Sequence, residues 1–104
     1  MKLRFAEAAQ RELNEAALWL ELQEAGLGER FLLEVAQARR LILDYPQAWH
    51  PLGASLRRCH LKRFRYGLIY RVKEDGIEII AVAHDRQQPE YWRDRKGKGK
   101  GQAA

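Results

Sequence analysis

The sequence predicts an α+β domain in which a short N-terminal strand and an antiparallel helical hairpin pack on a small antiparallel sheet. Three observations lead to this prediction. Apolar residues recur at helical spacing in the first half of the chain, they recur at strand spacing in the second half, and a glycine-rich turn separates the two helical stretches. Helices with one apolar stripe must bury it, and the predicted sheet offers the surface.

The first two elements are a strand and a helix. The segment KLRF, Lys2 to Phe5, alternates polar and apolar residues, which is typical of a short strand. The segment AEAAQRELNEAALWLELQEAG that follows is rich in helix formers. Its apolar residues recur at i, i+3, i+4 and i+7, which gives one apolar face formed by Leu13, Ala16, Ala17 and Leu20.

A second helix is predicted between the AGLGER turn and Pro46. Gly26 and Gly28 suit a helix C-terminal cap followed by a tight turn. Pro46 prevents the second helix from continuing far. The two helices therefore form an antiparallel hairpin over about residues 6–45. The apolar stripe of the second helix is predicted to be Phe31, Val35, Ala38, Ile42 and Tyr45.

A loop and three strands are predicted in the second half of the chain. The segment PQAWHPLG, Pro46 to Gly53, contains two prolines and a glycine and is read as a loop. From Leu56 onward, SLRRCHLKRF has the two-residue period of a strand. The segment YGLIYRVKEDGIEIIAVAH is a β-hairpin that turns at Asp75-Gly76.

The second strand of this hairpin is predicted to lie inside the sheet. Ile80 and Val82 make the strand apolar on both faces, a pattern that is typical of interior strands. The alternation of side chains along a strand predicts which residues share a face. In the first strand these are Leu68, Tyr70 and Val72, and in the second they are Ile77, Ile79, Ala81 and Ala83.

The composition is that of one globular domain. A chain of 104 residues with 46% hydrophobic residues can bury a core without disulfides or metal. The single Cys59 excludes an intramolecular disulfide, and three scattered histidines do not have metal-ligand spacing, so neither a metal nor a cofactor is expected. Because the N-terminus lacks an apolar signal core and no segment is long enough to span a bilayer, the expected compartment is the cytoplasm.

The charge predicts an anionic partner, either nucleic acid or an acidic protein. The formal net charge is +5, and the cations crowd into two stretches, Arg57 to Arg71 and Arg86 to Lys100. A solvated basic face is the alternative, but the clustering beside an apolar strand favours binding. Residues 96–104, KGKGKGQAA, are predicted to form a disordered basic tail.

The segments RRCHLKRFRYGLIYRV, IEIIAVAH and RQQPEYW, in this order after a helical hairpin, resemble the RelE/ParE superfamily of type II toxins. The resemblance implies that residues 1–95 form one toxin domain of a plasmid stabilisation type, which arrests growth unless a small antitoxin wraps and silences it. ParE-like members inhibit DNA gyrase. RelE-like members cut messenger RNA in the ribosomal A site without metal.

The resemblance favours a ParE-like gyrase inhibitor neutralised by a cognate antitoxin. RelE-like nucleases typically carry an arginine just after the tyrosine of the stretch that matches RYGLIY, where this chain has Gly67. Two alternatives stay open, a non-toxic degenerate member and a ribosome-dependent, metal-independent endoribonuclease acting on mRNA. The candidate catalytic residues of that nuclease are Lys62, Arg63, Arg65, His84, Arg86 and Tyr91.

Binding of an anionic partner is predicted to involve cations near the third strand and residues of the C-terminal segment. His84 is interpreted as a hydrogen-bonded residue that closes the sheet, in preference to a proton carrier. Trp92 is expected to anchor the C-terminal segment on the sheet, although Tyr91 and Trp92 could instead stack on a base. The predicted binding residues are Arg57, Arg58, Lys62, Arg63, Arg65, Arg71, Arg86, Tyr91 and Trp92.

Overall fold

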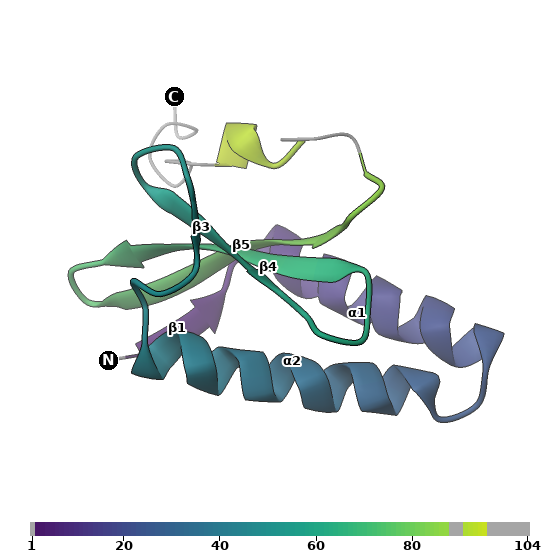
Figure 1. Cartoon of the computed structure of the whole chain (residues 1–104). Coiled ribbons are helices and arrows are strands. Elements are labelled where there is room, and N and C mark those ends of the chain that lie inside the picture. Colours follow the sequence, from purple (N-terminus) through teal and green to yellow (C-terminus); the bar gives the residue numbers. More distant parts are fainter. Residues whose placement is uncertain (1, 88–90, 96–104) are drawn as a thin grey trace.

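The computed structural model describes residues 2–87 and 91–95, which form two layers (Figure 1). Two long helices lie side by side against one face of a five-stranded sheet, and the C-terminal segment crosses the other face. The α+β prediction is therefore confirmed. The elements are β1 (Lys2–Phe5), α1 (Glu7–Gln23), α2 (Leu27–Asp44), β2 (His50–Leu52), β3 (Leu56–His60), β4 (Tyr66–Lys73), β5 (Gly76–His84) and the 3₁₀ helix η1 (Arg93–Arg95).

The sheet has the strand order β1-β5-β4-β3-β2. β5 lies between β1 and β4, which confirms the prediction of an interior strand. The sheet is mixed rather than wholly antiparallel, because β1 runs parallel to β5 while the other neighbours are antiparallel. A parallel pair needs a long crossover, and the helical hairpin supplies it. In the described part of the chain, no helix combines the length and apolar character that crossing a membrane requires.

The helical hairpin is confirmed, with two corrections. Gly26 has a φ of 91° and makes the turn, whereas Gly28 lies inside α2 and is not a cap. A Cβ on Gly28 would lie 2.4 Å from the carbonyl oxygen of Ala17 on α1, so this glycine lets the two helices approach closely. Tyr45 does not extend the buried stripe of α2. It follows the last helical residue, where the backbone leaves the helical conformation, and it is 61% exposed.

The segment predicted as a loop contains β2, the strand at the edge of the sheet. Pro51 lies in this strand opposite Arg57 of β3. Proline has no backbone N–H to donate in a hydrogen bond, and an edge strand tolerates this because it has a neighbouring strand on one side only. The prediction of a loop is wrong at residues 50–52, because a proline excludes backbone pairing on only one side of a strand.

A β-bulge reverses the side-chain alternation along β5. Ile69 pairs with Ala81 and Tyr70 pairs with Ile79, so Ile80 is an extra residue in the ladder. Ile77, Ile79 and Val82 therefore pack under the helices, while Ile80, Ala81 and Ala83 pack on the opposite face. The prediction that Ile77, Ile79, Ala81 and Ala83 share one face is wrong for this reason.

Each face of the sheet carries an apolar cluster. The larger cluster lies under α1 and α2 and includes Phe31, Ile42, Leu68 and Tyr70. The smaller cluster lies under the C-terminal segment, where Trp92 is 2% exposed. Trp92 anchors this segment on the sheet, as predicted. Its neighbours in the cluster are Leu56, Ile69, Ile80, Ala81 and Ala83.

Candidate functional site

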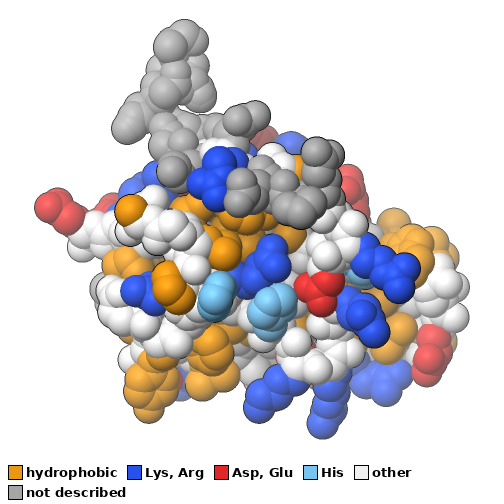
Figure 2. Space-filling view, turned by 45° about the horizontal axis from the view of Figure 1, so that its top comes forward, with side chains coloured by type: hydrophobic (Ala, Val, Ile, Leu, Met, Phe, Trp, Pro, Cys, Tyr) orange, Lys and Arg blue, Asp and Glu red, His pale blue; other side chains and the backbone are white. Residues whose placement is uncertain are grey.

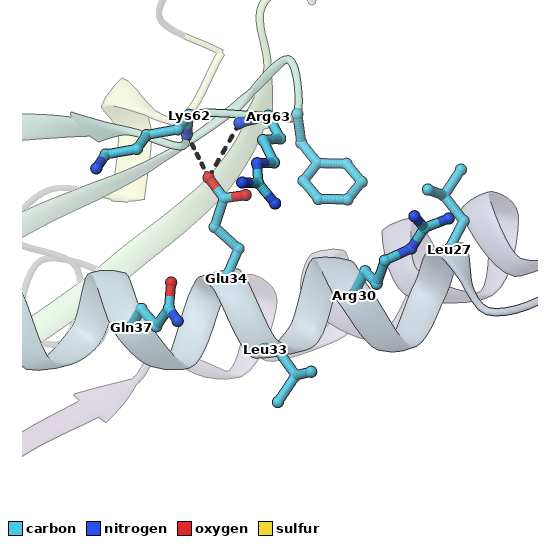
Figure 3. Close-up of a pocket in the computed structure, with 8 residues that line it drawn as sticks. Leu27, Arg30, Leu33, Glu34, Gln37, Lys62 and Arg63 are labelled. Atoms are coloured by element: carbon cyan, nitrogen blue, oxygen red, sulfur yellow. Dashed lines mark hydrogen bonds between the residues drawn. The ribbon is translucent and has the colours of Figure 1, made fainter.

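The cationic loop between β3 and β4, residues 61–65, is held on α2 by one carboxylate. Glu34 accepts hydrogen bonds from the backbone N–H groups of Lys62 and Arg63, the second at 3.1 Å (Figure 3). Leu61 is buried, and its N–H donates to the carbonyl of Tyr66 at 2.9 Å. The loop backbone is thus fixed from both sides, which presents the Lys62 and Arg63 side chains at a defined place beside α2.

A groove of about 560 Å³ lies between this loop and α2. Its walls combine apolar and cationic side chains. Arg30 pairs with Glu24 at 3.2 Å, and Glu34 is occupied by the loop backbone. Leu33 points away from the loop, at the outer side of α2 (Figure 3). The groove, which we call the α2 groove, is lined by Leu27, Arg30, Leu33, Glu34, Gln37, Lys62, Arg63 and Phe64.

A chain of aromatic rings supports the base of this loop. Phe31 of α2 meets Phe64 edge to face at 5.3 Å and Tyr66 at 5.2 Å between ring centroids. Tyr66 in turn meets the His84 ring at 4.9 Å. These geometries are favourable for aromatic pairs. The rings connect the buried side of α2 to the start of β4 and to the end of β5, and so they keep the loop in a fixed position relative to the sheet.

His84 ends β5 in a hydrogen-bonded turn. Its Nδ1 accepts a hydrogen bond from the backbone N–H of Arg86 at 2.9 Å, and its own backbone N–H donates to Gln87 Oε1 at 2.7 Å. Nδ1 is therefore occupied, and the ring packs against Tyr66. These contacts agree with a histidine that closes the end of the sheet. Nearby, His60 Nδ1 lies 3.7 Å from Asp85 Oδ1 in an exposed pair.

Tyr91 lies against Glu12 of α1. Its hydroxyl donates to Glu12 Oε2 at 2.9 Å and lies 3.4 Å from the carbonyl oxygen of Val82. Arg95 donates to both oxygens of the same carboxylate at 3.0 Å each. Burial, followed by the hydrogen bond to Glu12, raises the pKa of Tyr91 well above its usual value. Tyr91 is therefore a structural contact, tied to two residues that sequence reasoning had not singled out.

The structure places the residues predicted to bind at several separate positions. Arg57 donates to the carbonyl of Trp49 at 2.7 Å and to Gln47 at 2.9 Å, which fastens the segment before β2. Lys62 and Arg63 border the α2 groove. In the view of Figure 2, Lys and Arg side chains lie in several groups, with apolar, acidic and histidine side chains between them. Three of the remaining residues line one small hollow: Arg58, Tyr91 and Trp92. Arg71 pairs with Glu78. Arg65 and Arg86 are exposed.

Residues 3–89 match the family model described as the ParE toxin of the type II toxin-antitoxin system, parDE. The chain belongs to the ParE toxin family. Its relatives include Toxin ParE2 of two Mycobacterium tuberculosis strains, CDC 1551 / Oshkosh and ATCC 25618 / H37Rv. The chain is 28% identical to each over 89 residues, which are 85% of both proteins.

A solved structure has the same fold. The chain superposes with a TM-score of 0.67 on a chain of the structure titled "Chromosomal ParDE TA system from P. aeruginosa", with 18% identity, over 81% of this chain and 95% of that one. This ParE-family protein is thus the toxin component of a type II toxin–antitoxin system, and its partner is a cognate antitoxin.

In this ParE-family toxin, Gly67 is buried in β4 opposite His60 of β3. A Cβ there would lie 3.3 Å from Cγ of Arg58, so the stem of Arg58 occupies the space beside the glycine. A long cationic side chain at this position would have to displace Arg58. Within the described residues, no group of three or more His, Cys, Asp and Glu is arranged to hold a metal ion.

Proposed function

We propose that this toxin inhibits DNA gyrase in the cytoplasm, that its cognate antitoxin suppresses the inhibition, and that the α2 groove receives the antitoxin. Support for the target comes first from the family, since gyrase inhibition is the activity of ParE toxins and the family model matches residues 3–89. The observation that carries the choice against RNA cleavage is that the candidate catalytic residues are divided between two sites, and that His84 and Tyr91, the titratable pair, are engaged in structural hydrogen bonds.

RNA cleavage without metal requires a base, an acid and cations around one phosphate. In this chain, Lys62 and Arg63 border the α2 groove, while His84 and Tyr91 line a hollow of about 80 Å³ with Arg58. The Tyr91 hydroxyl donates a hydrogen bond to Glu12, and burial raises the pKa of Tyr91 further, so this hydroxyl is held protonated in a structural contact. Gly67 supplies no charge. The arrangement therefore favours a binding protein over a nuclease.

The α2 groove has the chemistry to receive an acidic, amphipathic segment of the antitoxin. Arg30, Lys62 and Arg63 provide cations along its rim, and Leu27 and Phe64 provide apolar surface. Amphipathic segments commonly bind in grooves of this mixed kind, and complementary charge adds specificity and speeds association. Because Glu34 fixes the loop backbone, the groove exists before the partner arrives.

The test of the proposed target is a supercoiling assay with purified gyrase. The toxin should block supercoiling, and an equimolar amount of antitoxin should restore it. Primer extension on translated messages, run with the same toxin preparation, should show no new cuts in the A site. Expression without antitoxin should arrest growth and induce DNA damage signalling.

Two other results would replace this proposal. Cuts at codon boundaries that Arg86→Ala or His84→Ala abolishes would establish the nuclease. A protein that binds antitoxin, inhibits neither gyrase nor translation and permits normal growth would be a degenerate member of the family.

A further inference from the structure

Five cationic side chains from four elements converge on one hollow where β1 meets α1. Its volume is about 380 Å³, within the range of roughly 300–1,000 Å³ that is typical of ligand pockets. It lies apart from the α2 groove, with which it shares no lining residue. The cations are Arg4 of β1, Arg11 of α1, Arg71 and Lys73 of β4, and Arg95 of η1.

Three of these cations share a single carboxylate. Arg4, Glu78 and Arg71 stand opposite one another on β1, β5 and β4, so their side chains form a row across the sheet. Glu78 is 9% exposed and accepts from Arg4 and Arg71 at 3.1 Å each. Lys73 lies 3.7 Å from the same carboxylate. One negative charge therefore faces three positive charges in a partly desolvated place.

The remaining charged groups at the hollow leave this excess of positive charge in place. Arg95 is neutralised by Glu12. The side chain of Arg11 is exposed and makes no ion pair with residues 2–87 or 91–95. Glu7 is the remaining carboxylate in the lining. Five cations thus stand against the two lining carboxylates, Glu7 and Glu78, and against Glu12, which pairs with Arg95, so positive charge is in excess at the hollow.

We propose that this hollow, the Arg4–Arg71 pocket, binds a phosphate group, and that the backbone of a nucleic acid is its source. Guanidinium groups bind phosphate oxygens in pairs and keep their charge at any physiological pH. Donors on β1, α1 and β4 approach the hollow from several directions, which suits a tetrahedral oxyanion better than a planar carboxylate. The net charge of +5 adds long-range attraction to a polyanion. This property is independent of gyrase inhibition.

The test uses the purified full chain and a fluorescein-labelled 20-base-pair DNA duplex, with anisotropy measured over a range of salt concentrations. The variant combines Arg4→Gln and Arg11→Gln, both at exposed side chains. Each lost phosphate contact lowers the slope of log affinity against log salt by about 0.9, so the double variant should lose about two units of slope. Arg11→Gln alone should lose about half of that, and it disturbs no described ion pair.

The matched control combines Arg39→Gln and Arg40→Gln. It removes the same charge from exposed side chains that do not line the pocket, and it should leave the slope nearly unchanged. An equal loss in both double variants would overturn the proposal, since binding would then follow net charge alone. Thermal unfolding of every variant shows that the comparison is made between folded proteins.

Inorganic phosphate and an octaglutamate peptide distinguish the possible ligands. In a nitrogen-15 correlation spectrum, phosphate should shift the amides of residues 4–11 and 71–78. If phosphate shifts them and the duplex does not bind, the site is a phosphate site for small molecules. If the peptide alone shifts them, the pocket binds acidic protein and the phosphate proposal is wrong.

Discussion

The Glu12 carboxylate on α1 and the Tyr91 hydroxyl are joined by a hydrogen bond of 2.9 Å across 79 positions of the sequence. They meet at the free edge of β5. Among the described strands, β1 pairs with β5 only as far as Ile79, so the edge beyond it has no neighbouring strand. Side chains take the place of a strand there. Val82 N–H donates to Glu12 at 2.9 Å, and Arg95 donates to the Ile80 carbonyl at 3.1 Å.

The first prediction concerns the stability of this edge. Glu12→Ala removes the shared acceptor of Val82, Tyr91 and Arg95, and it leaves those donors without their partner. Losing a partly buried, charged acceptor of this kind should lower the free energy of unfolding by about 2–4 kcal/mol. Urea denaturation measures the change. The control is Glu15→Ala, an exposed carboxylate on the same helix, which should stay within about 0.5 kcal/mol of the wild type.

If Glu12→Ala and Glu15→Ala had equal effects, the contacts of Glu12 would be solvated and replaceable. Limited proteolysis of the two variants provides an independent measurement. The Glu12 variant should be cleaved in residues 85–95 faster than the Glu15 variant, because the C-terminal segment depends on Glu12 for its attachment.

The second prediction concerns stability at alkaline pH. Burial raises the pKa of Tyr70 to about 12, and burial together with Glu12 raises the pKa of Tyr91. Because the unfolded chain releases these protons first, near pH 10, their stabilising effect is present below pH 10 and is lost as the pH rises through the folded-state values. The free energy of unfolding should therefore fall from pH 9.5 toward pH 11.

Tyr91→Phe should make this alkaline fall shallower, and Tyr70→Phe should do so independently. Tyr70 donates to the carbonyl of Pro46 at 2.6 Å, on the other face of the sheet, so the two effects should add. Urea midpoints at half-unit steps of pH measure the slope. The prediction would be contradicted if the double variant, which combines Tyr70→Phe with Tyr91→Phe, showed the same pH dependence of the urea midpoint as the wild type.

The helical hairpin and the interior strand could be predicted because their signals are local. The stripe Phe31, Val35, Ala38 and Ile42 needs only helical periodicity, and all of these residues are buried. β2 was missed because Pro51 is compatible with a strand only at an edge, and the sequence does not say which strand lies there. The bulge at Ile80 was invisible because residues 79–83 are apolar throughout, so a shift of phase leaves the pattern unchanged.

The candidate site was predicted less well because its contacts are not local. Glu34 and Lys62 are 28 positions apart, and Glu12 and Arg95 are 83 apart. No spacing rule connects such pairs. Cations that are close in the sequence also lie apart in the fold. Arg57 and Arg58 lie on opposite faces of β3, whereas Lys62 and Arg63 border the groove beside α2. Clustering along the chain therefore predicted one cationic surface where the fold makes several.

The third prediction concerns the close approach of the two helices. Gly28→Ala places a methyl group 2.4 Å from the Ala17 carbonyl oxygen, and the helices must separate to admit it. The free energy of unfolding should fall by about 1–3 kcal/mol. Gly26→Ala is the matched change two residues earlier. It meets open space, and its φ of 91° makes the cost about 1–2 kcal/mol through backbone strain alone.

The two glycine variants differ in where the damage appears. Gly28→Ala should shift the amide resonances of both helices near residues 17 and 28, whereas Gly26→Ala should affect the turn alone. Shifts confined to the turn in both variants would mean that the helices do not need a glycine at position 28.

The last prediction concerns antitoxin binding at the α2 groove. Lys62→Glu with Arg63→Glu reverses the charge on one wall, so an acidic antitoxin segment should bind at least about tenfold more weakly at low salt. The difference should narrow as salt is added, because exposed charges are screened. Isothermal titration or surface plasmon resonance at several salt concentrations measures both effects. The control, Arg39→Glu with Arg40→Glu, makes the same change in net charge outside the groove and should have a small effect.

Glu34→Ala separates the position of the loop from its charge. This variant keeps Lys62 and Arg63 but removes the carboxylate that holds their backbone N–H groups. If the groove must be formed in advance, affinity should fall and salt should not restore it, because the loss is one of preorganisation rather than of charge. A Glu34→Ala variant that binds as well as the wild type would show that the antitoxin itself orders the loop. A charge-reversed pair with undiminished affinity would place the antitoxin on another surface.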